Sequence, residues 1–161
     1  MSLPLRHRPI DLALGFFFAI SVIYGLLFSL PEGLGVPVSA DSPWPPLRSL
    51  HGWAVAQEAA HLDPPAVLRA STIFDGFAQS PFLVVLLYSM VRGRDWIRRP
   101  ALVYSGAAVV NMFFYFFTTF MGEHPPPNLG TYLAFNLPWL FAPIVLGARM
   151  WRREPFSRAA F

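Results

Sequence analysis

A single carboxylate interrupts one of the apolar stretches of the sequence. The segment STIFDGFAQSPFLVV begins at Ser71 and carries Asp75, followed four residues later by Gln79. Residues four apart lie on the same face of a helix, so both polar side chains would point in one direction. An ionisable residue inside a membrane costs about 3 kcal/mol on insertion scales and normally faces a bundle interior or a cavity. We therefore predict that Asp75 faces a cavity, where it can bind a protonated amine beside aromatic rings or a sterol-type hydroxyl group.

The composition of the chain is that of a membrane protein. Its 161 residues are 55 % hydrophobic and only 13 % charged, with a mean hydropathy of +0.46, whereas soluble domains contain about 25 % charged residues. The chain has no cysteine, which excludes disulfides and thiolate metal sites. Its basic residues are all arginine and flank apolar segments, so membrane topology explains them better than a nucleic-acid partner. No soluble-enzyme motif occurs, and neither a cofactor nor a metal site is predicted.

Four apolar runs are long enough to cross a bilayer, which takes roughly 20 helical residues. We predict spans at about 11–31, 67–91, 100–121 and 128–150. Together they would form one all-α integral membrane domain over residues 1–161, a bundle of four transmembrane helices. A signal peptide cleaved after Ala40 is the alternative for the first run, but that run exceeds the usual hydrophobic region of about 7–15 residues.

The arginines predict the direction of the spans. They precede span one, crowd the link between spans two and three, and follow span four: Arg6, Arg8, Arg92, Arg94, Arg98, Arg99, Arg149, Arg152, Arg153 and Arg158. The loop at 32–66 is acidic instead, with Arg48 as its only arginine. The positive-inside rule therefore places both termini in the cytoplasm, as an even number of spans requires. Arginine in place of lysine suggests GC-rich coding, so we expect a bacterial cytoplasmic membrane, or the endoplasmic reticulum membrane in a eukaryote.

Each predicted span offers a polar group at about the same depth. A rise of about 1.5 Å per residue places Asp75 and Asn136 both roughly 12 Å below the non-cytoplasmic surface. Polar side chains often only hold helices together, at about 0.6 kcal/mol each. This packing role is favoured for Ser21 and Asn111. For Asn136 a packing role and a functional role are equally favoured, and for Asp75 a functional role is favoured. The side chains expected at this level are Ser21, Tyr24, Asp75, Gln79, Asn111, Tyr115, Asn136 and Trp139.

The loop at 32–66 contains one further helical pattern. Its segment LRSLHGWAVAQEAAH places four apolar side chains on one face, as in a short helix that lies in the membrane interface. These side chains are Leu47, Leu50, Trp53 and Ala54.

Polar residues follow this segment. Asp63 is placed to cap the next helix at its N-terminus. Three further polar residues have two possible locations, the mouth of a cavity or a solvated loop: Glu58, His51 and His61. The sequence favours the solvated loop.

Four segments resemble the EXPERA family: LDPPA, FDGFAQSP, RDWIRRPALVYS and FNLPWLFAPIVLGARMW. The resemblance extends over nearly the whole chain and is greatest to the sigma-2 receptor branch; another branch contains the emopamil-binding protein, a sterol Δ8–Δ7 isomerase. It implies a four-helix bundle with an occluded, lipid-accessible pocket for sterols and cationic amphiphiles. Asp75 and Gln79 match the acid and glutamine of span two in that family. Asn136 and Trp139 are similar to an asparagine and a tryptophan of the isomerase branch.

The chain departs from the family pattern in span one. Ser29 occupies the place of a second acid of the sigma-2 branch, and Ser21 and Gly25 replace a histidine and a glutamate of the isomerase branch. Glu58 stands in for a loop acid only if a gap is allowed. Double-bond migration requires one group that gives a proton and another that removes one, and Asp75 supplies one alone.

Three functions fit these observations. The favoured one is non-enzymatic binding of a sterol-like or isoprenoid lipid, or of a cationic amphiphile. The second is a sterol isomerase with Asp75 as its catalytic residue. The third is a structural or chaperone-like membrane partner, which would be packed solid around Asp75. The partners are the bilayer and the ligand, with a homodimer left open. The predicted ligand-binding residues are Asp75, Gln79, Asn136, Trp139, Tyr115, Asn111, Ser21, Tyr24, Ser29 and Glu58.

Overall fold

A computed structural model describes residues 4–123 and 125–156 of the chain; His124 and Arg158 therefore lie outside the described residues. The described part is helical and contains no strand. Four helical segments are long and apolar enough to cross a membrane: Pro9–Gly33, Ala66–Arg92, Asp95–Met121 and Leu129–Met150. The predicted all-α bundle of four membrane-spanning helices is confirmed, with each boundary within a few residues of the prediction.

The first two spans are interrupted by π-helical turns, whereas the last two are regular α-helices. Span one consists of α1 (Pro9–Tyr24), the π-turn η2 (Gly25–Ser29) and α2 (Leu30–Gly33). Span two consists of α4 (Ala66–Ile73), the π-turn η4 (Phe74–Gln79) and α5 (Ser80–Arg92). Span three is α6 (Arg98–Met121), preceded by the short turn η5 (Asp95–Ile97), and span four is α7 (Leu129–Met150). The long loop, residues 34–65, contains α3 (Pro45–Gln57) and the short turn η3 (Ala59–His61).

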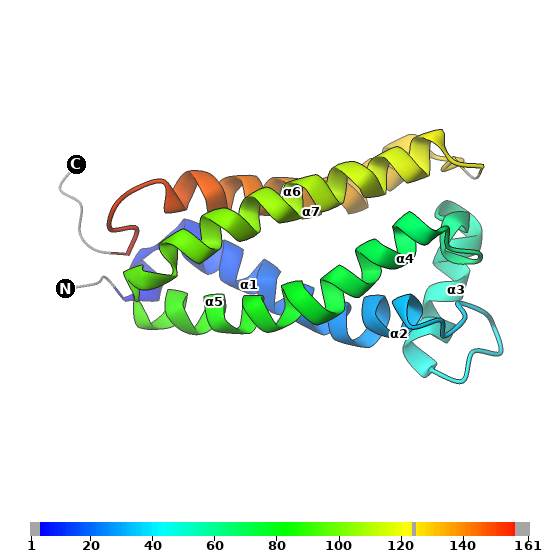
Figure 1. Ribbon diagram of the computed structural model, residues 1–161, viewed down its shortest axis with the longest axis horizontal. Helices are drawn as coiled ribbons and strands as arrows, with labels where there is room; N and C mark the ends of the chain where they lie inside the picture. Colours follow the sequence, from blue (N-terminus) through cyan, green and yellow to red (C-terminus); the bar gives the residue numbers. More distant parts are fainter. Residues whose placement is uncertain (1–3, 124, 157–161) are drawn as a thin grey trace.

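The spans pack as two pairs, with α6 along α7 and α1 along α5 (Figure 1). The described part of the chain begins and ends at the same end of the bundle, and α3 lies at the opposite end (Figure 1). This arrangement fits the even number of spans. That the end with the termini is the cytoplasmic one stays a prediction from the arginines.

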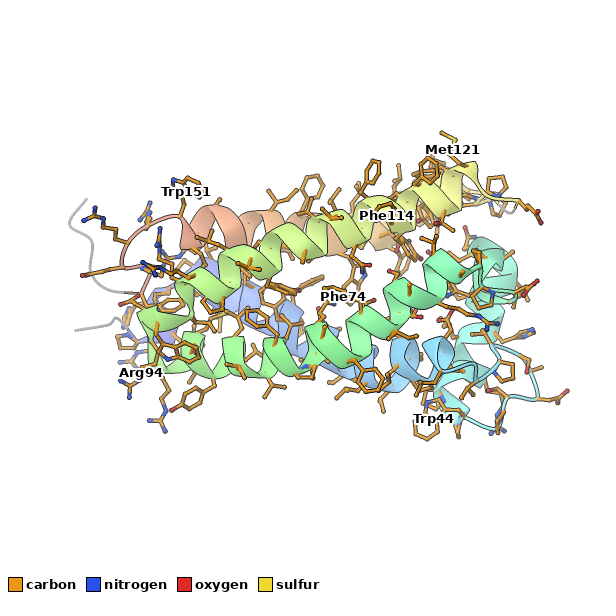
Figure 2. All side chains as sticks on the ribbon, viewed as in Figure 1. Trp44, Phe74, Arg94, Phe114, Met121 and Trp151 are labelled. Carbon is orange, nitrogen blue, oxygen red and sulfur yellow. The ribbon has the colours of Figure 1, made fainter. Side chains whose placement is uncertain are left out.

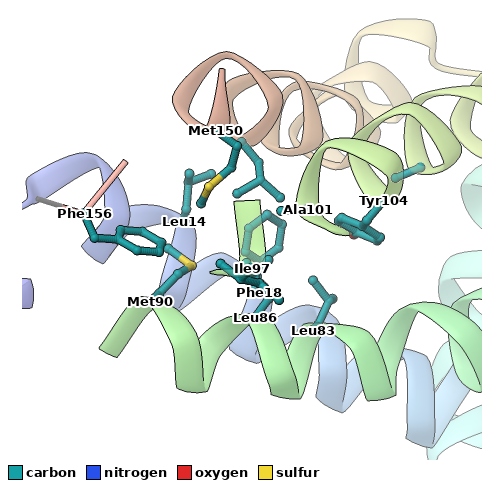
Figure 3. Packing of buried hydrophobic residues seen from close by; sticks show 12 residues of the cluster. Leu14, Phe18, Leu83, Leu86, Met90, Ile97, Ala101, Tyr104, Met150 and Phe156 are labelled. Atoms are coloured by element: carbon teal, nitrogen blue, oxygen red, sulfur yellow. The ribbon is translucent and has the colours of Figure 1, made fainter. Parts of the chain in front are cut away.

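The half of the bundle nearest the termini has a closely packed apolar core (Figure 3). Phe18, Leu83, Leu86 and Leu146 are each at most 1 % exposed. Phe156, which follows the last helix, is fully buried against the same cluster. The polar residues predicted at mid-depth are absent from this cluster and lie farther from the termini.

A buried ion-pair cluster ties the two ends of the chain together. Arg8 Nη1 lies 2.8 Å from Asp11 Oδ2, and Arg149 Nε lies 2.9 Å from Asp11 Oδ1. Asp11 is fully buried, so its charge depends on these two partners. Arg149, one of the arginines that predict membrane orientation, therefore joins α7 to α1, and Arg8 donates to the Met90 carbonyl near the end of α5.

A proline follows each π-turn. Leu30 N–H bonds to the carbonyl of Gly25, and Ser80 N–H bonds to that of Asp75, both five residues back. Pro31 and Pro81 come directly after these residues, and a proline ring excludes the carbonyl four residues before it. A wider turn accommodates that carbonyl. In span one the carbonyl released by Pro31 is that of Leu27, which accepts a 2.6 Å hydrogen bond from Trp44 Nε1.

The two π-turns lie against each other, and glycines permit the contact. A Cβ atom on Gly76 would lie 2.4 Å from Leu30 Cβ, and one on Gly25 would lie 3.0 Å from the Asp75 carbonyl oxygen. Both separations are shorter than a normal van der Waals contact. The backbones of spans one and two therefore approach each other closely beside Asp75.

Two expectations about the long loop are wrong. The predicted apolar face of α3 does not face a membrane interface, because Leu47 and Ala54 are fully buried within the protein. Asp63 does not cap span two, since α4 begins at Ala66 with Pro65 in the capping position and no side-chain cap. The long loop therefore folds back onto the end of the bundle.

We predict that Gly76→Ala destabilises the bundle, because the new methyl group would overlap Leu30. Overpacking of this kind costs about 1–3 kcal/mol, which should lower the midpoint of thermal unfolding in detergent by several degrees. Gly106→Ala is the matched control, because no atom lies within 4 Å of the added Cβ. Equal midpoints for the two variants would contradict the close approach of the spans.

Candidate functional site

A cavity of about 280 Å³ lies among the four spans on the side of the long loop. All ten predicted site residues line it: Ser21, Tyr24, Ser29, Glu58, Asp75, Gln79, Asn111, Tyr115, Asn136 and Trp139. Leu50 and Trp53 of α3 also line it, so the long loop closes the end of the cavity. Ligand binding by these residues stays a prediction.

Asp75 lies in the π-turn η4, and its side chain reaches span three. Its Oδ1 accepts a 3.1 Å hydrogen bond from Asn111 Nδ2 on α6. One turn on, Gln79 Oε1 accepts a 3.1 Å hydrogen bond from Tyr104 on α6. Asp75, Gln79 and Asn111 form the inner polar cluster, which faces the cavity from spans two and three.

Glu58 forms the centre of a second polar cluster. Its Oε1 accepts hydrogen bonds from Tyr115 Oη at 2.8 Å and from Asn136 Nδ2 at 2.7 Å. Its Oε2 accepts a 2.6 Å hydrogen bond from Trp53 Nε1. All three partners donate, and a carboxylate accepts through both of its oxygens. Glu58 therefore binds the long loop to α6 and α7, and it also bonds to α3 within that loop.

His61 extends this cluster to span one. Its Nδ1 lies 2.6 Å from Glu32 Oε1 on α2, and its Nε2 lies 3.3 Å from Tyr115 Oη. The Tyr115 hydroxyl already donates to Glu58, so its oxygen is left to accept from His61. Both imidazole nitrogens then face acceptors, which suits a ring that carries two protons. Glu32, Glu58, His61, Tyr115 and Asn136 form the outer polar cluster.

The surroundings of His61 favour its charged form. Burial lowers the pKa of His61, but the hydrogen bond to Glu32 and the negative charges of Glu32 and Glu58 raise it more. The net effect is a pKa above the ordinary value for histidine. His61 is 5 % exposed and Glu32 is 3 % exposed, so water screens their attraction little.

The expectation of a solvated loop at Glu58 and His61 is wrong, because both are buried and hydrogen-bonded. His51, the third loop residue, is half-buried and does not line the cavity. Glu32 was not predicted as a site residue, since it follows the expected end of span one. Span one in fact extends to Gly33.

Aromatic rings form much of the remaining cavity wall. Trp139 contacts Phe17 and Tyr24 of span one, with ring centroids 4.9 Å and 5.5 Å apart. Trp53 of α3 contacts Phe135 of α7 at 4.5 Å. Of the described residues that line the cavity, two are acidic and none is an arginine. This arrangement suits an apolar molecule that carries a cationic or hydrogen-bonding group.

Comparison with protein-family models gives one match. The model described as EXPERA (EXPanded EBP superfamily) matches residues 54–150, more than half of the chain. The matched part includes Glu58, His61, Asp75 and Asn136 but not the residues of span one. No curated protein sequence matches the chain.

We predict that Glu58→Gln loosens the long loop. The new amide nitrogen would face a donor, so at least one of the three hydrogen bonds would be lost. Such a loss costs about 1–3 kcal/mol of stability. Hydrogen exchange of residues 45–65, measured by mass spectrometry, should accelerate several-fold. Asp63→Asn, an exposed acid of the same loop, should leave exchange unchanged. Equal exchange in the two variants would exclude Glu58 as the link between the loop and the bundle.

We also predict that protection of the long loop decreases at alkaline pH. Because folding raises the pKa of His61, its stabilisation is complete below about pH 6.5 and is lost as pH rises through the raised value. Exchange of residues 45–65, corrected for intrinsic rates between about pH 6 and 9, should reveal this loss. His61→Gln should abolish the dependence, and a dependence that persists in that variant would contradict it.

Proposed function

Because the chain belongs to the EXPERA family of membrane proteins, we propose that it binds a sterol-like or isoprenoid lipid, or a cationic amphiphile, in the cavity around Asp75. The observation that carries this proposal is an aromatic-walled cavity within the bundle that contains Asp75 and Glu58 but no arginine. A hydrocarbon body would bury its surface against Trp139, Tyr24 and Phe135. Its amine or hydroxyl would meet the inner polar cluster.

The hydrogen bonding of the two cavity acids supports Asp75 as the primary contact of the ligand. Glu58 already accepts from Trp53, Tyr115 and Asn136, so a ligand donor would have to displace one of them. Asp75 accepts from Asn111 and lies deeper between the spans. A ligand cation beside Asp75 would be compensated there without loss of the contacts that hold the long loop.

The size of the cavity limits the ligand. About 280 Å³ is near the lower end of the range for small-molecule pockets. A compact ring system or the polar half of a longer isoprenoid fits such a volume. A larger ligand would require the long loop or a pair of spans to separate.

The sigma-2 receptor branch remains the proposed relationship within the family. Its second acid near the end of span one corresponds to Ser29 here. Glu32, one turn later, supplies a buried carboxylate at the same end of that span. We propose that Glu32 takes the place of that acid, although its oxygen is engaged by His61.

A sterol isomerase is the second candidate, and one observation favours it. The sequence offered Asp75 alone, but the cavity also contains His61 and Glu58. One of these groups would protonate the double bond and another would remove a proton from the adjacent carbon. Incubation with a Δ8 sterol, analysed by gas chromatography, tests this candidate; no conversion over many hours would eliminate it.

A structural or chaperone-like role is the least supported of the three functions. It requires solid packing around Asp75, where a cavity is found instead. The proposed location is the bacterial cytoplasmic membrane, or the endoplasmic reticulum membrane if the source is eukaryotic, and a homodimer stays a proposal.

We predict that Asp75→Leu abolishes retention of the native ligand, because it removes the acceptor and fills part of the cavity. The protein would be extracted in mild detergent and its lipids measured by mass spectrometry. Asp75→Asn distinguishes two ligand types. Its affinity for a ligand that carries an amine should fall about ten-fold or more, whereas its affinity for a ligand that carries a hydroxyl should be largely retained. Asp63→Asn is the exposed control and should retain the lipid. Unchanged lipid in Asp75→Leu would refute the proposal.

A further inference from the structure

A shallow groove lies on the outer surface between spans two and three. Its lining comes from two stripes at helical spacing, each about 12 Å long. The stripe of span two is Phe74, Ala78 and Phe82, and that of α6 is Arg99, Pro100, Val103, Tyr104 and Ala107. These residues define the outer groove. Phe74 lies on span two near the middle of the bundle (Figure 2).

Small residues between large rings create the outer groove. Ala78 and Ala107, one on each side, are exposed and leave space between the aromatic side chains. At the base, Phe82 stacks on Tyr104 with ring centroids 4.8 Å apart. The Tyr104 hydroxyl donates to Gln79, which lines the cavity. The hydrogen-bonded pair of Tyr104 and Gln79 therefore separates the groove from the cavity. The two are distinct sites.

One arginine marks the end of the groove nearest the chain termini. Arg98 donates to the carbonyls of Trp151 and Arg152, and Arg92 lies over the Tyr88 ring. Arg99 is exposed, and within the described part of the chain its side chain has no hydrogen-bond or ion-pair partner. The neighbouring Arg94 lies at the same end of the bundle but outside the groove (Figure 2).

We propose that the outer groove binds an acyl chain of an anionic phospholipid whose phosphate pairs with Arg99. Both helices cross the membrane, so hydrocarbon is the natural occupant of an apolar groove on their outer face. Arg99 lies where the polar headgroup of such a lipid would be. Basic pockets between transmembrane helices at the cytoplasmic side are suited to anionic headgroups, and a guanidinium can bind phosphate through two hydrogen bonds.

The test uses the full-length protein in detergent, titrated with phosphatidylglycerol or phosphatidylcholine of identical chains. Native mass spectrometry counts the lipids that remain bound. Wild-type protein should retain one phosphatidylglycerol in preference to phosphatidylcholine. Arg99→Gln should weaken phosphatidylglycerol binding about five-fold, which corresponds to the attraction of one arginine near an anionic surface. Arg94→Gln is the matched control and should weaken it much less.

Further variants test the groove itself. Ala107→Phe fills it and should abolish retention of the lipid, whereas Val145→Phe adds the same ring to an exposed position of α7 and should not. Equal losses in Arg94→Gln and Arg99→Gln, equal retention of the two lipids by wild type, or unchanged binding in Ala107→Phe would overturn the proposal. Asp75→Asn should leave phosphatidylglycerol binding intact, so the result is independent of the function proposed for the cavity.

Discussion

The Glu58 carboxylate is the interaction on which the position of the long loop over the cavity depends. Three donors from three helices, Trp53, Tyr115 and Asn136, converge on its two oxygens. Below the membrane surface each such group needs an internal partner, because lipid offers none. By meeting this requirement for all three helices, Glu58 fixes the long loop on the bundle. The His61–Glu32 pair adds span one to the same set of contacts.

The bundle is solid at one end and hollow at the other because its two ends use different side chains. Near the termini, aliphatic and aromatic residues such as Leu83, Leu86 and Phe18 fill the space between the spans, and the charge of Asp11 is neutralised by two arginines. Toward the long loop, small residues such as Ser21 and Gly25 line the cavity together with the carboxylates of Asp75 and Glu58. Polar pairs satisfy these groups around the rim, and the centre stays open.

Hydropathy and helical rise were sufficient to predict the spans and the cavity level, because both depend only on residue spacing within single helices. Asp75, Asn111 and Asn136 could therefore be placed at one depth before any contact was known. Burial of Glu58 and His61 could not be predicted, since it depends on where the long loop folds. The apolar face of α3 was likewise ambiguous, because a membrane interface and a bundle end both attract such a face. Pro31 and Pro81 were the available signals for the π-turns.

The π-turns affect both the packing of spans one and two and the direction of the side chains near the cavity. A π-turn adds a residue to a helical turn and thereby rotates the remainder of the helix about its axis. In span two the turn contains Asp75 and Gln79 themselves, and in span one it ends at Ser29, just before Glu32. Regular helices would turn these residues toward other faces and would change the contacts of Gly25 with Asp75 and of Gly76 with Leu30. The two turns contact each other beside Asp75, so the backbone just before Pro31 and Pro81 belongs to the same region of the bundle as the acids.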